Sequence, residues 1–84
     1  MSKSPLSGLN VLVLEDELLL RKRLAGFLEN EGASVTAVGT VAAARQAAES
    51  LPFDVALLDV NLPDGRGTDL LRDKVFSATT NVLL

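Results

Sequence analysis

The sequence predicts an α/β fold built on an open parallel β-sheet. Two apolar runs, NVLVL at residues 10–14 and VALL at residues 55–58, have the length of buried strands. Each run ends in acidic residues and is followed by a segment with a helix-like pattern. Strand and helix segments that alternate along a chain are typical of a parallel sheet with crossover helices.

The first half of the chain reads as strand, helix and strand. Residues 9–14 form the first strand, and residues 17–31 the helix, whose apolar stripe consists of Leu20, Leu24, Phe27 and Leu28. Gly32 is well placed as a left-handed helix stop. Residues 34–38 alternate as an edge strand does.

The second helix and the third strand follow. Thr40 can cap a helix over residues 41–51, in which Arg45 and Glu49 stand four residues apart. Pro52 ends that helix. Residues 54–59 form the third strand.

The last segments are a loop, a short helix and the start of a fourth strand. Residues 61–67, NLPDGRG, form a turn-rich loop. Thr68 can cap a short helix over residues 69–75, with Asp69 at its positive end. Residues 81–84, NVLL, begin the fourth strand.

The predicted strand order is 2-1-3-4. The first and third strands are the most continuously apolar and are therefore central, and right-handed crossovers place the second strand outside the first. The winding direction then reverses between strands 1 and 3. Ligand sites of open α/β sheets lie at such a switch point, beyond the carboxyl ends of the strands.

Three acidic residues, Glu15, Asp16 and Asp59, follow the two central strands. Neighbouring strands lie about 4.8 Å apart, so we expect the three carboxylates to share one corner. Taken singly, Asp16 reads as a helix N-cap, Glu17 as a first-turn acid and Asp59 as the start of a turn. Together they favour a bound cation, and all-oxygen ligands select a hard ion such as Mg²⁺.

The motifs VLVLEDE and VALLDVNLPDGRG resemble the receiver domain of bacterial response regulators, over residues 9–84. The resemblance implies a flavodoxin-like fold in which Asp59 is the phosphoacceptor and Asp16 a direct ligand of Mg²⁺, with Mn²⁺ as a possible substitute. It further implies that Glu15 reaches the metal through water and that the backbone carbonyl of Asn61 binds it. Pro63 and Gly67 match positions that shape the loop.

Receivers continue through a fifth strand and two more helices, so two functional residues of the family have no counterpart among residues 9–84. These residues are a Ser or Thr at the end of strand 4 and a Lys at the end of strand 5. We expect Thr79, Thr80 and Lys74 to lie too far from the acids to replace them. We therefore interpret residues 1–8 as a flexible leader and residues 9–84 as the N-terminal portion of a receiver. We expect either that these residues belong to a longer chain or that they self-associate, for example as a homodimer.

Composition narrows the function classes. The net charge of −3 gives no basic stripe for nucleic acid, and no apolar stretch is long enough to span a membrane. The absence of cysteine and histidine excludes thiolate and imidazole chemistry within these residues. We expect a cytoplasmic, non-enzymatic domain whose partner is a histidine kinase or a phosphotransfer protein.

Two other functions are compatible with the acids. One is an interaction module that signals without phosphorylation, which a titration with beryllofluoride and Mg²⁺ would distinguish. The other is a Mg²⁺-dependent phosphohydrolase with a nucleophilic Asp59, which would need a second acid where Asn61 stands.

Overall fold

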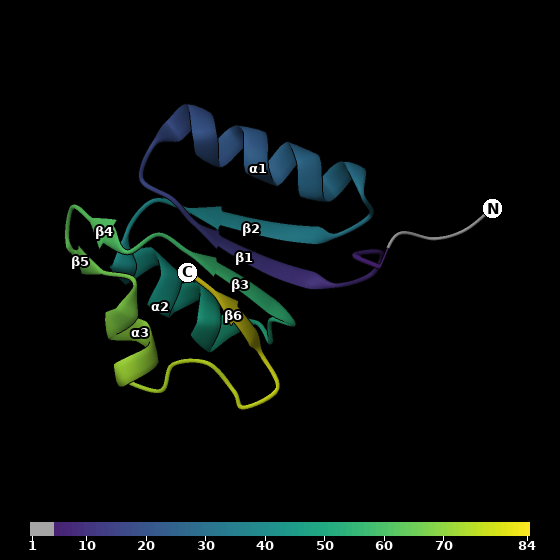
Figure 1. Ribbon diagram of the computed structural model, residues 1–84. Helices are drawn as coiled ribbons and strands as arrows, with labels where there is room; N and C mark the ends of the chain where they lie inside the picture. The colour runs from purple at the N-terminus through teal and green to yellow at the C-terminus, as the bar shows by residue number, and fades with distance from the viewer. Residues whose placement is uncertain (1–4) are drawn as a thin grey trace.

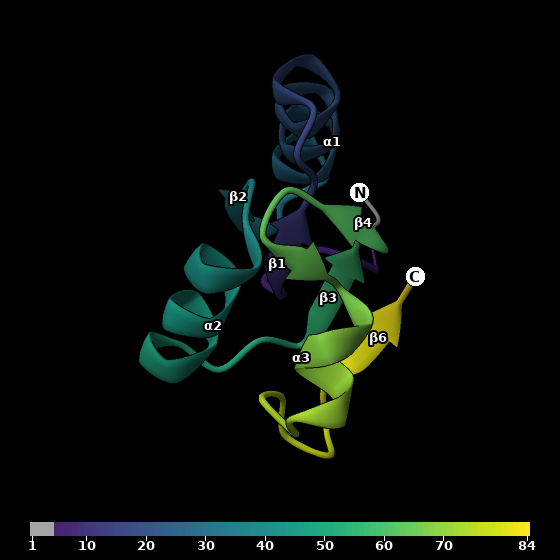
Figure 2. The ribbon, with the colours of Figure 1, turned by 90° about the vertical axis from the view of Figure 1, so that its left-hand side faces the viewer.

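The computed structural model describes residues 5–84, which form a parallel four-stranded sheet between two layers of helices (Figure 1). The strands of this sheet are β1 (Asn10–Leu14), β2 (Ser34–Val38), β3 (Val55–Leu58) and β6 (Asn81–Leu83). Their order is β2-β1-β3-β6, which confirms the predicted order and makes NVLL the fourth strand. One face is covered by α1 (Leu18–Asn30), and the other by α2 (Val41–Ser50) and α3 (Thr68–Arg72) (Figure 2).

Strand β1 lies at the centre of the core and contributes to both of its layers. Val11 and Val13 pack with Leu28 on the side of α1. Leu12 and Leu14 pack in the other layer, which includes residues of α2 and α3. Burial on both faces explains why this strand is continuously apolar and does not alternate.

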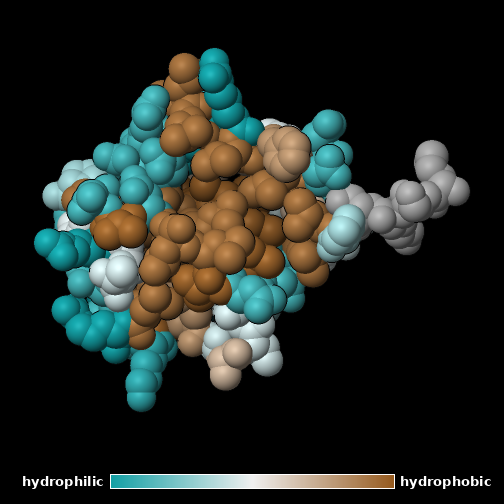
Figure 3. Space-filling view, in the orientation of Figure 1, coloured by the Kyte–Doolittle hydropathy of each residue, from teal (hydrophilic) through white to brown (hydrophobic). Residues whose placement is uncertain are grey.

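Helix α1 buries only part of its apolar stripe. Leu28 is buried and Leu24 packs partly against the core, but Leu20 is 40% exposed and Phe27 is 63% exposed. The helix packs mainly on β2 and β1, and no described helix covers β3 and β6 on that side. The apolar stripe is therefore only partly covered, and hydrophobic side chains gather on this face of the molecule (Figure 3).

The segment between β3 and α3 is a small hairpin, which the sequence did not predict. Its strands are β4 (Asn61–Leu62) and β5 (Gly65–Arg66). The predicted cap of α3 is also wrong, because Thr68 is the first residue of the helix and Gly67 precedes it. Asp69 does lie in the first turn, where its Oδ2 accepts the backbone N–H of Arg66 at 3.1 Å.

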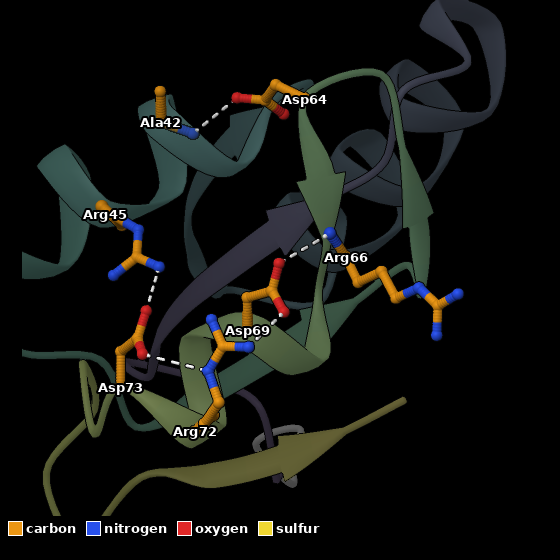
Figure 4. A network of polar contacts seen from close by, with 7 residues as sticks. All are labelled: Ala42, Arg45, Asp64, Arg66, Asp69, Arg72 and Asp73. Atoms are coloured by element: carbon orange, nitrogen blue, oxygen red, sulfur yellow. Dashed lines mark hydrogen bonds and ion pairs between the residues drawn. The ribbon is translucent and has the colours of Figure 1, made fainter.

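Contacts of side chains connect α2 with α3. Thr40 caps α2 as predicted, because its Oγ1 accepts the N–H of Ala43 at 3.1 Å. Arg45, however, forms an ion pair with Asp73 and not with Glu49 (Figure 4). The docking of α3 beside α2 brings a carboxylate to Arg45 that an isolated helix would not offer.

The amino-terminal segment lies against the turn after α1. Residues 1–4 of the predicted leader lie outside the described residues, and Pro5–Gly8 form a turn. The N–H of Gly8 donates to the carbonyl of Gly32 at 3.0 Å, and Leu6 packs against the core on the side of α1. Gly32 has a φ of +92°, which confirms it as the left-handed stop of α1. Within residues 5–84 the structure contains no helix of the length and apolarity that crossing a membrane requires.

Candidate functional site

Hydrogen bonds at the carboxyl edge of the sheet hold the acidic residues beside one another. Leu14 of β1 is the register partner of Leu58 of β3, so Glu15 and Asp59 both follow paired positions. The N–H of Asp59 donates to the carbonyl of Leu14 at 2.9 Å, and the N–H of Glu15 donates to the carbonyl of Val38 at 3.0 Å. The backbone of both acids is thereby fixed by the sheet.

The carboxylates of Glu15, Asp16 and Asp59 form a cluster at this edge. Each offers one oxygen, and these oxygens lie within 4.8 Å of one another. Glu15 and Asp59 are half-buried, whereas Asp16 is exposed. No Lys or Arg among residues 5–84 forms an ion pair with any of the three. The structure thus brings the three predicted site residues together without an ion pair to any of their carboxylates.

The electrostatics of this cluster act on the titration of Glu15. Burial raises the pKa of the Glu15 carboxyl group, and the negative charges of Asp59 and Asp16 raise it further. The backbone N–H of Glu17 acts against this shift by donating to Glu15 Oε1 at 3.4 Å, but the pKa remains raised. A bound divalent cation would relieve this repulsion.

The simpler structural roles considered for Asp16 and Glu17 are not the ones observed. Helix α1 begins at Leu18, and its N-cap residue is Glu17, whose side chain makes no capping hydrogen bond. The first turn of α1 contains no acidic residue. The exposed carboxylate of Asp16 is therefore free of helix capping and available to a ligand.

The donor set fits a hard cation. Carboxylate oxygens at this spacing are the ligands that Mg²⁺ takes, usually with several waters in the remaining positions. Asn61 stands two residues after Asp59, at the start of β4. Binding of the metal ion by the backbone carbonyl of Asn61 stays a prediction.

Gly67 lies against the backbone of Asp59 and is buried. A Cβ atom at this position would collide with the carbonyl oxygen of Asp59 and lie 3.4 Å from the Cβ of Leu58. The N–H of Gly67 also donates to the carbonyl of Val60 at 3.0 Å. The sequence predicted a loop-shaping role for Gly67, and the structure shows that the hairpin closes onto Asp59 itself.

Two supporting residues escaped the sequence analysis. Asp64, in the hairpin turn, accepts the N–H groups of Val41 and Ala42 at 2.8 and 3.0 Å, so the hairpin is attached to the start of α2 (Figure 4). These two bonds lower the pKa of Asp64. Arg21 of α1 donates from Nη1 to the carbonyl of Glu15 at 2.9 Å. The contacts of Asp64 span 22 and 23 residues and that of Arg21 spans six, and no pattern in the sequence signals either of them.

Thr80 and Lys74 lie away from the cluster, as expected. The Oγ1 of Thr80 donates to the carbonyl of Phe53 at 2.7 Å, and Phe53 precedes β3 at the amino edge of the sheet. Thr79 lies beside it in the same turn, within hydrogen-bond distance of Ser77. Lys74 follows the end of α3 and is exposed.

Comparisons with known proteins agree with this architecture. Residues 11–83 match the family model described as the response regulator receiver domain. The chain is 32% identical over 75 residues to the TorCAD operon transcriptional regulatory protein TorR of Escherichia coli O157:H7, which covers 89% of this chain and 33% of TorR. It therefore spans about a third of the length of that relative.

Solved structures show the same fold. A mutant of the MaeR response regulator bound to sulfate superposes with a TM-score of 0.80 at 28% identity, over 93% of this chain and 66% of MaeR. The receiver domain of the histidine kinase CKI1 from Arabidopsis thaliana, complexed with Mg²⁺ and BeF₃⁻, superposes with a TM-score of 0.75 at 28% identity, over 83% of this chain and 58% of that receiver-domain chain. The family match, the strand order and the acidic corner together show that the chain belongs to the response regulator receiver domain family.

Proposed function

We propose that this protein accepts a phosphoryl group on Asp59 from a histidine kinase or a phosphotransfer protein, as the receiver of a two-component system. The observation that carries the proposal is the cluster of Glu15, Asp16 and Asp59, whose oxygens lie within 4.8 Å at the switch point of the sheet. The Mg²⁺ complex of the CKI1 receiver supports a magnesium ion here.

Each residue of the site has a proposed role. Asp16 and Asp59 would hold Mg²⁺ directly, Glu15 through water, and Asn61 by its backbone carbonyl. When bound, the ion would offset the repulsion between the acids and the incoming phosphoryl oxygens. Mn²⁺, which also prefers oxygen ligands, would occupy the same site.

The transfer step needs only the nucleophile and a good leaving group. An oxygen of the Asp59 carboxylate forms a bond to phosphorus, while the bond from phosphorus to the donor nitrogen of a phosphohistidine breaks and its electron pair stays on that nitrogen. The product is an acyl phosphate on Asp59. A carboxylate requires no general base for this attack, because it carries no proton to remove.

Phosphorylation of the full polypeptide tests the assignment. Incubation with acetyl phosphate and Mg²⁺ should add one phosphoryl group to the parent protein and none to Asp59→Asn, as measured by intact mass. Asp54→Asn is the matched control, since Asp54 precedes the same strand at its opposite end and its oxygen can still accept the N–H of Asn10. Full phosphorylation of Asp59→Asn would contradict the assignment.

A titration with beryllofluoride and Mg²⁺ separates this function from phosphorylation-independent binding. The phosphoryl mimic should bind the parent protein and not Asp59→Asn. A parent protein that binds its kinase but neither beryllofluoride nor phosphate would be an interaction module.

A further inference from the structure

We propose that Arg21 is a positioning residue for the cation site, because it holds the peptide that joins Glu15 to Asp16. The inference rests on the cation site of the proposed function. Arg21 lies in the first turn of α1 and is half-buried, and its Nη1 donates to the carbonyl oxygen of Glu15 at 2.9 Å. The guanidinium group of Arg21 thus contacts the backbone of the site and none of its carboxylates.

This hydrogen bond completes the anchoring of Glu15. The N–H of Glu15 already donates to the carbonyl of Val38 at 3.0 Å, so both backbone polar groups of Glu15 are bound. The carbonyl of Glu15 and the N–H of Asp16 belong to one planar peptide unit. Holding that carbonyl therefore fixes the direction in which the chain enters Asp16.

Asp16 depends on this anchoring more than the other two acids do. The backbone N–H groups of Glu15 and Asp59 donate to carbonyls of the strands beside them, whereas Asp16 is exposed and lies between β1 and α1. If the Glu15–Asp16 peptide could rotate, the Asp16 carboxylate would leave the cluster and the cation would lose a ligand.

Gly39 provides the space that the guanidinium group occupies. A Cβ atom on Gly39 would lie 2.5 Å from Arg21 Nη1 and 3.4 Å from its Cζ. Gly39 is not among the described glycines with positive φ, so its backbone conformation does not require glycine. The end of β2 therefore supports the site in two ways. The carbonyl of Val38 accepts the N–H of Glu15, and Gly39, which has no side chain, leaves space for the guanidinium group of Arg21.

The charge of Arg21 and its position predict opposite effects on cation binding. A positive charge close to the three acids repels Mg²⁺. If Arg21 acted only through its charge, its removal would therefore strengthen Mg²⁺ binding. If Arg21 positions Asp16, its removal weakens binding although the local charge becomes more negative. The sign of the change therefore identifies the role.

The experiment is a titration of the full polypeptide with MgCl₂, followed by the backbone amide signals of Glu15, Asp16 and Asp59 in NMR spectra. Arg21→Met removes the guanidinium group and keeps an unbranched side chain. Gly39→Ala displaces the guanidinium group and keeps its charge. Both should weaken Mg²⁺ binding about tenfold, the effect typical of residues that orient metal ligands.

A charge control and a double variant sharpen the result. The side chain of Arg23 is exposed and makes no hydrogen bond or ion pair with other described residues, so Arg23→Met should leave Mg²⁺ affinity within about twofold of the parent or slightly tighter. Gly39→Ala should add nothing to Arg21→Met, because both remove the same contact. Gly39→Ala displaces only the end of a flexible side chain, so it tests the inference even if Arg21→Met fails to fold.

The outcomes separate this inference from the function on which it rests. Parent protein that binds Mg²⁺, with Arg21→Met and Gly39→Ala binding as tightly or more tightly, would overturn the positioning role alone. Parent protein that shows no Mg²⁺ binding would overturn the cation site and this inference with it.

Discussion

Asp16 combines exposure with a place in the acidic cluster, so its charge can be removed with little effect on the core. Asp16→Asn should weaken Mg²⁺ binding at least tenfold, a loss of about 1.4 kcal/mol in binding free energy, because one anionic ligand is lost. Calorimetric titration with Mg²⁺ measures the change. Glu17→Gln is the matched control, since Glu17 is the adjacent exposed acid outside the cluster. Equal affinity of Asp16→Asn and the parent would place the metal elsewhere.

Gly67 is restricted by a close approach of backbone. Gly67→Ala would push against the carbonyl oxygen of Asp59, which cannot move without disturbing β3, so we expect a loss of about 1–3 kcal/mol in the free energy of unfolding. Gly26→Ala is the contrasting variant, because a Cβ there meets nothing within 4 Å in the interior of α1. It should stabilise the protein by about 1 kcal/mol. Urea unfolding measures both, and a Gly67→Ala midpoint equal to that of the parent would contradict the close approach.

At the scale of elements, Asp64 attaches the β4–β5 hairpin to α2. Its two carboxylate oxygens accept the N–H groups of Val41 and Ala42, while Thr40 accepts that of Ala43, so the first turn of α2 is capped by two segments. An anion at a helix N-terminus is also favoured by the helix dipole. The hairpin that carries Gly67 is therefore fixed at its tip as well as at its base.

The stability that Asp64 contributes should depend on pH. Because its pKa is lowered in the folded protein, the contribution is complete above the ordinary carboxyl value of 3.8 and is lost as pH falls through the lowered pKa. Asp64→Asn should therefore unfold at lower urea than the parent at neutral pH, and the two midpoints should converge below pH 3.8.

The control for this measurement is Glu29→Gln, which removes an exposed carboxylate that forms no hydrogen bond or ion pair with other described residues. Its urea midpoint should follow that of the parent at every pH. A difference between Asp64→Asn and the parent that persists at acid pH would show that Asp64 acts through packing and not through charge.

At the scale of the whole molecule, one face of the sheet is incompletely covered. Leu83 is 57% exposed and Leu84 67% exposed at the end of β6, which pairs with β3 on one side only. Phe27 of α1 is also exposed, and a cavity of about 230 Å³ lies on the same side, lined by residues that include Leu24, Leu57 and Leu83. An apolar edge strand beside an apolar face favours association with another chain.

We therefore expect a polypeptide of these 84 residues to self-associate, with an apparent mass in light scattering that rises with concentration. Leu83→Lys should reduce the association, since a charge on an edge strand opposes pairing. Leu51→Lys is the matched control, because Leu51 is 51% exposed but follows α2 on the opposite side of the sheet. A monomer at every concentration, with one cooperative unfolding transition, would contradict the expectation.

Much of the fold and the candidate site could be predicted from local pattern. The runs at residues 11–14 and 55–58 are continuously apolar, which is typical of strands inside a parallel sheet, although only β1 is buried on both faces and Val55 and Leu57 of β3 are half-buried. Such strands must be central, so the strand order and the acidic corner of Glu15, Asp16 and Asp59 follow from the sequence with the rule for right-handed crossovers.

Only the tertiary structure decided how these elements meet. The sequence could not show that Leu20 and Phe27 stay exposed, because burial of a helix stripe depends on which elements cover it. Arg45 pairs with Asp73 and Arg21 binds the carbonyl of Glu15 through contacts between separate elements, which sequence periodicity does not record. The sequence by itself therefore determined the strands and their acidic ends, since these follow from burial and chain direction. The supports that hold the acids in place depend on how separate elements pack against one another, and packing is a property of the folded molecule.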